Sequence, residues 1–288
     1  MYSLSKQTKT LSTRKKTIIA YLRSGLKRTL CLSLLTFISA HSMAQDTEDF
    51  SPDAPGATTG VDIMKPGKID WETGIVLEWD RRNGEHARTF TINTSLFRLG
   101  LTPQAEVRLQ IDECITHTPE GNFGGIANAA IGTKIKVYEG GKVLPKVSFM
   151  GTILIPCGSN AHYLPKHVGI QTHLLFENEL SSKFTLGYDL GGEWDGDTES
   201  PDLFFGANLT YQPTDKWSFY VESYNRYNSK RQDDWAKPGH DSHFNFMSEV
   251  GVDYKVSPRL HLNTYYDISF NEFSRYSNIG LGIAWLLN

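Results

Sequence analysis

The chain has 288 residues, of which 39% are hydrophobic, 12% aromatic and 21% charged, and its formal net charge is -3. Outside the N-terminal region no apolar run reaches the roughly 18 residues of a membrane-spanning helix, which excludes a helical membrane bundle. The 15 Phe, 13 Tyr and 6 Trp are too many for a disordered chain and, together with 25 Gly, favour strands and turns over helices.

Residues 1–44 have the pattern of a secretory signal peptide. They hold eight basic residues and no acidic one, then the apolar stretch 29–40, and then Ser42-Met43-Ala44 with small residues at the −3 and −1 positions of a cleavage site. The alternative is an uncleaved anchor, but the apolar stretch is short for a span. Cleavage of the signal peptide on export would leave a mature chain with 21 of the 29 basic residues and all 32 acidic ones. A mature chain this acidic is a poor nucleic-acid binder.

Residues 45–67 are rich in Asp, Pro and Gly and are predicted to be an extended periplasmic lead segment. From residue 68 to residue 288, period-two segments of roughly 9–13 residues alternate with turn clusters. A tilted transmembrane β-strand needs about 9–11 residues, which these segments match. The predicted segments are Ile69–Trp79, Thr89–Leu101, Ala105–Ile115, Ile126–Tyr138, Leu144–Ile155, His167–Glu179, Lys183–Trp194, Asp202–Tyr211, Trp217–Tyr227, His243–Tyr254, Leu260–Asn271 and Tyr276–Leu287.

The connections between these segments alternate in length. Those around residues 102–104, 139–142, 181–182, 212–216 and 256–259 are short, whereas 116–125, 156–166, 195–201 and 228–242 are longer. Bacterial outer-membrane barrels show the same alternation between short periplasmic turns and long external loops. Two connections on the long side, 80–85 and 272–275, are short for this rule. An even strand number would also leave both chain ends in the periplasm.

The two faces of each segment differ in polarity. In the last segment Ile279, Leu281 and Ile283 share one face, and Gly280 and Gly282 lie on the other. A soluble sandwich also alternates in this way. However, five of the 6 Trp lie on the apolar face near segment ends, as in the aromatic girdles of membrane barrels. The predicted fold class is therefore all-β: a transmembrane antiparallel up-and-down β-barrel of about 12 strands. A change of phase predicts a β-bulge near Asn93–Ser95.

The polar face of such a barrel lines its lumen. Arg98, Arg108, Lys134 and Lys136 share the polar phase on three successive segments and are expected to form one basic patch. Two interpretations stay open: a buried network of ion pairs that stiffens the interior, or the charged wall of an aqueous pore, with both possible at different depths. The predicted lumen-facing charges are Arg98, Glu106, Arg108, Asp112, Lys134, Lys136, Asp189, Glu222, Arg226, Glu249, Asp253 and Asp267.

Several motifs resemble the outer-membrane barrels of the "MetA-pathway of phenol degradation" family, also called simply transporters. Residues 95–102 followed by 105–109 are similar to the family's Arg-x-Gly-Leu-Thr hairpin and its Glu-x-Arg continuation, and residues 55–60 and 66–74 are similar to its opening. The chain departs from the family at Asp53-Ala-Pro55, where Asp-Arg-Pro is typical. The resemblance implies an outer-membrane barrel that passes small solutes, aromatic or hydrophobic ones among them.

The alternatives are a closed structural or adhesive barrel and a lipid-hydrolysing enzyme. Some outer-membrane phospholipases also have about twelve strands, and His240-Asp-Ser-His243 offers the Ser-His pair that nucleophilic catalysis needs. These residues lie in the longest predicted loop without the His-x-Ser-Asn-Gly context of those enzymes, so a solvated loop is favoured. His167 and His173 are too far apart on one strand to share a metal ion. We predict no catalytic, cofactor or metal site.

The expected location is the outer membrane of a Gram-negative bacterium, reached through a Sec-type signal peptide. The expected partners are outer-membrane lipid and lipopolysaccharide, the barrel-assembly machinery during biogenesis and a small-molecule solute that the sequence does not identify; nucleic acid is not expected. Cys114 and Cys157 either pair in the exported protein or stay as isolated thiols.

Overall fold

The structure, a computed structural model, describes residues 50–53, 56–82, 85–119, 121–141, 143–157, 167–197, 200–229, 244–270 and 274–288. The predicted signal peptide, the first part of the lead and the loop containing His240 and His243 lie outside the described residues, so what the sequence predicts for them stays a prediction. No helix within the described residues is long and apolar enough to cross a membrane.

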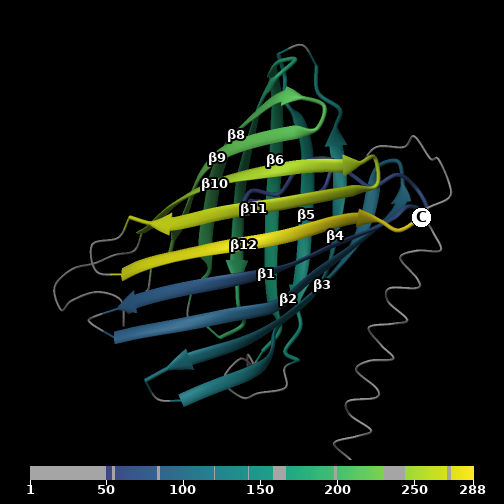
Figure 1. Ribbon diagram of the computed structural model, residues 1–288. Coiled ribbons are helices and arrows are strands. Elements are labelled where there is room, and N and C mark those ends of the chain that lie inside the picture. Colours follow the sequence, from purple (N-terminus) through teal and green to yellow (C-terminus); the bar gives the residue numbers. More distant parts are fainter. Residues whose placement is uncertain are drawn as a thin grey trace, which may run out of the picture. The chain divides into compact units, whose positions relative to one another are not determined.

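The described part of the chain contains twelve strands: β1 (Ile69–Arg82), β2 (Glu85–Thr102), β3 (Ala105–Thr118), β4 (Gly121–Tyr138), β5 (Lys146–Leu154), β6 (Gly169–Ser181), β7 (Phe184–Trp194), β8 (Asp202–Thr214), β9 (Trp217–Tyr227), β10 (Phe244–Ser257), β11 (Leu260–Ser269) and β12 (Ser274–Leu286). Each pairs antiparallel with the next, and β1 pairs with β12 to close the barrel (Figure 1). This topology confirms the predicted all-β, up-and-down barrel.

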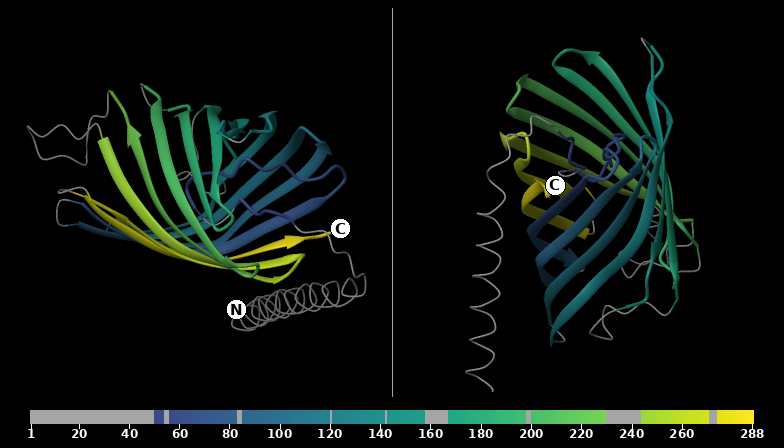
Figure 2. Two further views of the ribbon diagram at one scale, coloured as in Figure 1. Left: turned by 90° about the horizontal axis from the view of Figure 1, so that it is seen from above. Right: turned by 90° about the vertical axis from the view of Figure 1, so that its right-hand side faces the viewer.

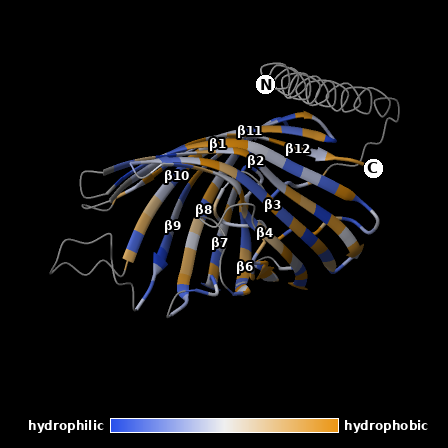
Figure 3. Ribbon diagram, turned by 90° about the horizontal axis from the view of Figure 1, so that it is seen from below, coloured by the Kyte–Doolittle hydropathy of each residue, from blue (hydrophilic) through white to orange (hydrophobic). Residues whose placement is uncertain are grey.

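Side chains alternate between the two faces of the barrel wall. Large apolar side chains such as Leu281, Val250 and Ile153 point outward and are about half exposed, whereas charged and amide side chains fill the inner face. Figure 3 shows the resulting orange and blue bands along the strands. Trp194 and Trp217 lie at strand ends on the outer face, as predicted. An apolar outer band is the surface that lipid requires of a spanning barrel.

The connections follow the predicted alternation in part. The end of the barrel where β1 begins and β12 ends, here called the terminal end, carries two-residue turns at 103–104, 182–183, 215–216 and 258–259. The connection predicted to be short at 139–142 is longer in the structure, because it extends over 139–145. At the opposite loop end, 155–168, 195–201 and 228–243 are longer. The predicted loop 116–125 is wrong, because β3 and β4 keep pairing from Glu113↔Ile126 to Thr118↔Gly121 and leave a tight turn.

The predicted β-bulge is present in β2. Pairing with β3 skips from Thr91 to Asn93, and pairing with β1 shifts between Gly74 and Val76. The irregularity therefore centres on Ile92, slightly earlier than the range Asn93–Ser95. One extra residue in a strand reverses which side chains face inward beyond it, which accounts for the change of phase in the sequence.

The lead segment differs from its predicted place. Residues 50–53 and 56–67, here called the luminal lead, lie inside the ring of strands rather than in the periplasm (Figure 2). Pro66 forms a β-bridge with Gly100 where the lead joins the barrel wall, next to the start of β1. A chain without apolar periodicity can enter a lumen because the inner wall supplies partners for its backbone polar groups.

Candidate functional site

The luminal lead forms a loop that rises from the terminal end and returns to it. Its tip reaches the middle of β9, where the Thr58 amide donates to Glu222 Oε1 at 2.7 Å. On the way back the Met64 amide donates to Glu106 Oε2 at 2.8 Å, close to the terminal end of β3. The wall thus binds the lead through backbone amides, which any sequence offers, and through the specific charges described next.

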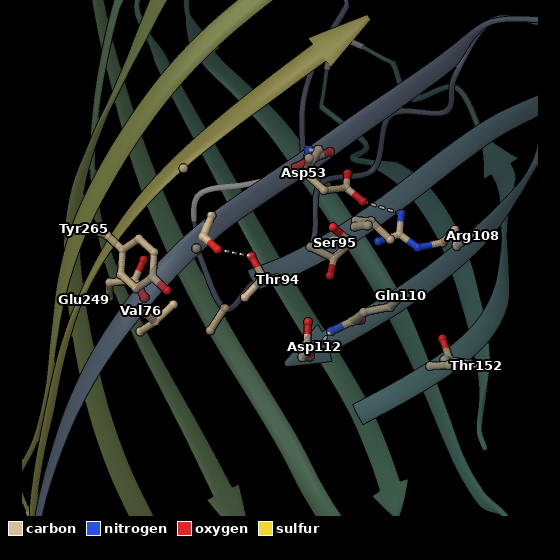
Figure 4. A pocket seen from close by; sticks show the side chains of 18 of the residues that line it. Asp53, Val76, Thr94, Ser95, Arg108, Gln110, Asp112, Thr152, Glu249 and Tyr265 are labelled. Carbon is tan, nitrogen blue, oxygen red and sulfur yellow. Dashed lines mark hydrogen bonds and ion pairs between the residues drawn. The ribbon is translucent and has the colours of Figure 1, made fainter. Parts of the chain in front are cut away.

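An ion cluster holds the base of the lead against β1–β4. Arg98 is fully buried and its guanidinium lies 3.1 to 3.6 Å from four carboxylates. Arg108 bonds Asp53 (Figure 4) and Glu106. Lys134 donates to Asp53 Oδ1 at 2.8 Å. We call this set the Arg98 cluster: Arg98, Arg108, Lys134, Asp53, Asp70, Glu72 and Glu106. It links the lead to four strands in one buried network.

Asp53 is the carboxylate that the lead itself contributes. Burial alone would raise the pKa of Asp53, but the charges of Arg98, Lys134 and Arg108 outweigh burial and hold that pKa well below its ordinary value. Asp53 therefore stays ionised wherever the cluster is assembled. A buried charge with three cationic partners is a strong anchor, because pulling the lead out would break all three of its ion pairs.

The tip of the lead contacts the opposite wall. Glu222 also accepts from Asn208, and the Thr59 amide bonds Asp189, which in turn binds His173 at 2.8 Å. Gly56 has a φ of 125° and lies so close to Glu222 that a Cβ there would be 2.9 Å from Oε2. Only glycine adopts this backbone without strain, so the sequence at this point is matched to the tip's position.

A cavity of about 460 Å³ occupies the lumen, and the lead lines part of it through Asp53, Gly56, Ala57 and Thr59. A smaller space of about 180 Å³ lies between the two arms of the lead, beside Lys68 and Leu286 at the terminal end. Since the lead lines both spaces, it stands between them. The larger cavity is within the size range of small-molecule sites.

A row of acidic side chains crosses the inner face of the barrel wall, and two of them, Glu249 and Asp267, line the larger cavity. Glu222, Glu249, Asp267, Asn278 and Glu78 are successive Cα partners on β9, β10, β11, β12 and β1. We call Glu222, Glu249, Asp267 and Glu78 the acidic row. Each of the last three accepts a bond from a tyrosine hydroxyl, from Tyr220, Tyr224 (2.5 Å) and Tyr276 (2.5 Å) respectively.

The predicted lumen charges thus separate into different surroundings. Arg98, Glu106, Arg108 and Lys134 meet in the Arg98 cluster, and Asp189 and Glu222 bind the tip of the lead. Glu249 and Asp267 belong to the acidic row. The other four lie apart: Asp112 accepts from Gln110 and Asn128, Asp253 binds His261 at 2.8 Å, Arg226 faces Glu193 and Asp202 near the loop end, and Lys136 pairs with Glu139.

The expected basic patch is wrong in two respects. Lys136 points to the turn at the terminal end, where its partner Glu139 is 72% exposed. The remaining three cations alternate with carboxylates, one of which, Asp53, comes from a segment outside the periodic pattern. Sequence reasoning also missed the luminal tyrosines, although Tyr220 and Tyr224 share the phase of Glu222 in the sequence. That shared phase was the available signal.

No group of three or more metal-binding side chains suited to an ion is found among the described residues. His167 bonds Asp197 at the loop end, so it is separate from His173. Cys114 is buried beside Thr91 and Cys157 is exposed, and both are free thiols. The paired cysteines considered from the sequence are therefore not formed.

Comparisons with known proteins agree with this architecture. An outer membrane channel from Pseudomonas putida F1 is similar with a TM-score of 0.60 and 12% identity, over 81% of this chain and 99% of that one. The translocator domain of the autotransporter NalP from Neisseria meningitidis has a TM-score of 0.51 and 12% identity, over 78% and 90%. No curated protein sequence matches. The model of the family described as "Putative MetA-pathway of phenol degradation" matches residues 52–287, and the chain belongs to that family.

Proposed function

We propose that this protein is an outer-membrane channel for small solutes whose lumen is narrowed by its own lead segment. The observation that carries the proposal is the cavity of about 460 Å³ inside a closed barrel. It is lined in part by the luminal lead, whose described residues join the strand pairing of the wall only at the bridge between Pro66 and Gly100. A purely structural barrel would gain by filling this space with packed side chains. The family's description adds aromatic compounds such as phenols as candidate solutes.

The test is solute flux into liposomes that contain the purified barrel. Deletion of residues 50–62 leaves the bridge between Pro66 and Gly100 and the whole wall intact. We expect the deletion variant to pass a small neutral sugar such as arabinose several times faster than the full chain, and to give larger conductance steps in planar bilayers. Silence of both proteins in both assays would favour the closed structural barrel. Phospholipid cleavage by the same sample would favour the enzyme alternative.

The proposal includes the outer-membrane location. The intact barrel should fractionate with the outer membrane and change its gel mobility on boiling. An epitope inserted in 212–216, at the terminal end, should be hidden on intact cells, whereas one in 228–242, at the loop end, should be accessible. The two insertions are matched controls for each other, and reversed accessibility would contradict the orientation. Recovery of the protein in the soluble periplasmic fraction would contradict the location itself.

A further inference from the structure

The acidic row places like charges next to one another. Residues opposite one another in an antiparallel ladder have Cα atoms about 4.5–5.5 Å apart, and like charges there are unfavourable. In the Arg98 cluster four carboxylates are matched by three cations. By contrast, no Lys or Arg nitrogen in the described part of the chain forms an ion pair with Glu249, Asp267 or Glu78. The row has hydrogen-bond donors but no countercharge.

The row also has free acceptor atoms. Asp267 and Asn278 are 0% and 6% exposed, and both line the large cavity. The amide nitrogen of Asn278 donates to Asp267 Oδ2 at 3.0 Å, which fixes the amide so that Asn278 Oδ1 is left without a donor. Asp267 Oδ1 lacks a donor as well. Two neighbouring buried acceptors without donors are expected to find one in a native structure.

An aromatic surface lies beside these acceptors. Tyr265 lines the cavity next to Glu249, and Figure 4 shows the two side chains together on the wall away from Arg108 and Asp112. The Tyr265 ring covers Gly280 of β12, where a Cβ would come within 2.2 Å of it. Tyr224 lines the same cavity. Rings beside carboxylates are the usual surroundings of a bound ammonium group, through cation–π attraction.

We propose that the acidic row, with Asn278 and Tyr265, is a binding site for the ammonium group of a small organic cation, and that such cations are solutes of this channel. The second clause rests on the proposed function. An ammonium group supplies both the missing countercharge and the missing donors. A chelated metal ion fits less well, because no group of three metal-binding side chains among the described residues is close enough to hold one. The cavity has room for an organic group beyond the charged end.

Binding to the full-length protein in detergent tests the site without requiring transport. The probes are benzylammonium, benzyl alcohol and benzoate, which differ in charge on one skeleton, and the readout is the shift in melting temperature as each is titrated. We expect benzylammonium to bind about tenfold more tightly than the other two, because only its ammonium group supplies the countercharge that no Lys or Arg of the described residues gives the row. Equal effects of benzylammonium and benzyl alcohol would overturn the proposal.

Two nearly isosteric variants and one control locate the effect. Glu249→Gln and Asp267→Asn should each weaken benzylammonium binding roughly fivefold, since one charge of the row is lost. Glu179→Gln, whose carboxylate is 69% exposed at the terminal end and pairs with Lys146, should leave binding unchanged. Unchanged binding in both row variants would overturn the site.

The two proposals can fail separately. Charge-selective binding without any flux through the deletion variant would contradict the proposed channel and support the proposed ammonium site. Arabinose flux without charge-selective binding would contradict the proposed ammonium site and support the proposed channel.

Discussion

Replacing Arg98 with alanine is expected to destabilise the barrel by about 3–5 kcal/mol, the range for removing one member of a buried ion pair. Its guanidinium is the shared partner of Asp53, Asp70, Glu72 and Glu106, so the variant leaves four carboxylates facing one another around two cations. The free energy of unfolding, from urea titration in lipid vesicles, measures the loss. The temperature at which the boiled and unboiled gel bands merge should fall as well.

Lys136→Ala is the matched control for this variant. It also removes a cation from the polar phase of a strand near the terminal end, but its partner Glu139 is exposed. Exposed pairs contribute only about 0–1 kcal/mol, so little change is expected. Equal stability of the two variants would mean that water fills the Arg98 cluster and that its side chains form a pore wall. At this depth the pore-wall interpretation would then replace that of a buried ion-pair network.

Asp53→Asn is expected to release the lead and to open the channel. The amide is almost the same size as the carboxylate but removes one of the two charges that Arg108 and Lys134 share, and leaves them only Glu106. If the loss is about 3 kcal/mol, the ratio of docked to free lead falls by about a hundredfold. Arabinose flux should rise toward that of the variant lacking residues 50–62, and added protease should cut the lead more readily.

Asp62→Asn is the control, because Asp62 reaches Arg98 through its backbone oxygen, which the substitution keeps. The pKa of Asp53 sets the pH dependence. A lowered pKa means that the carboxylate's contribution is fully present above the ordinary aspartate value of about 4 and is lost as pH falls through the lowered value. Asp53 should therefore keep the lead docked from pH 8 to pH 5. Flux that rose within this range in the wild type but not in Asp53→Asn would contradict the assignment.

The barrel could be predicted from sequence because each strand carries its own signal. Period-two alternation marks Ile279, Leu281 and Ile283 as lipid-facing wherever the neighbouring strands lie. The even strand number and the outward Trp residues follow from the same local pattern. The strand pairing seen in the structure adds information only where the period-two pattern breaks. This happens at the bulge around Ile92 and in the β3–β4 hairpin, whose strands continue into the predicted loop.

The lead could not be placed in this way. Residues 50–67 have no alternation. The partners of Asp53 come from β2, β3 and β4, and the sequence groups these cations in one patch without showing that the lead supplies a carboxylate to it. Burial of a segment by a closed wall is a property of the completed barrel and leaves no periodic trace in the segment. The luminal tyrosines were missed for another reason: aromatic residues were assigned to lipid, although Tyr220 and Tyr224 follow the polar phase.

The contacts of the lead span very different distances along the chain, and this orders the assembly of the protein. At its base, the Asp53 amide donates to Glu72, 19 residues away, and Lys134 is 81 residues from Asp53. The tip contact between Thr58 and Glu222 spans 164 residues. Contacts of short separation lose less chain entropy and form earlier. The base of the lead can therefore dock on β1–β4 while β9 is still unpaired, and the tip is captured when the last strands arrive. The nascent barrel would then curve around a segment that is already in place.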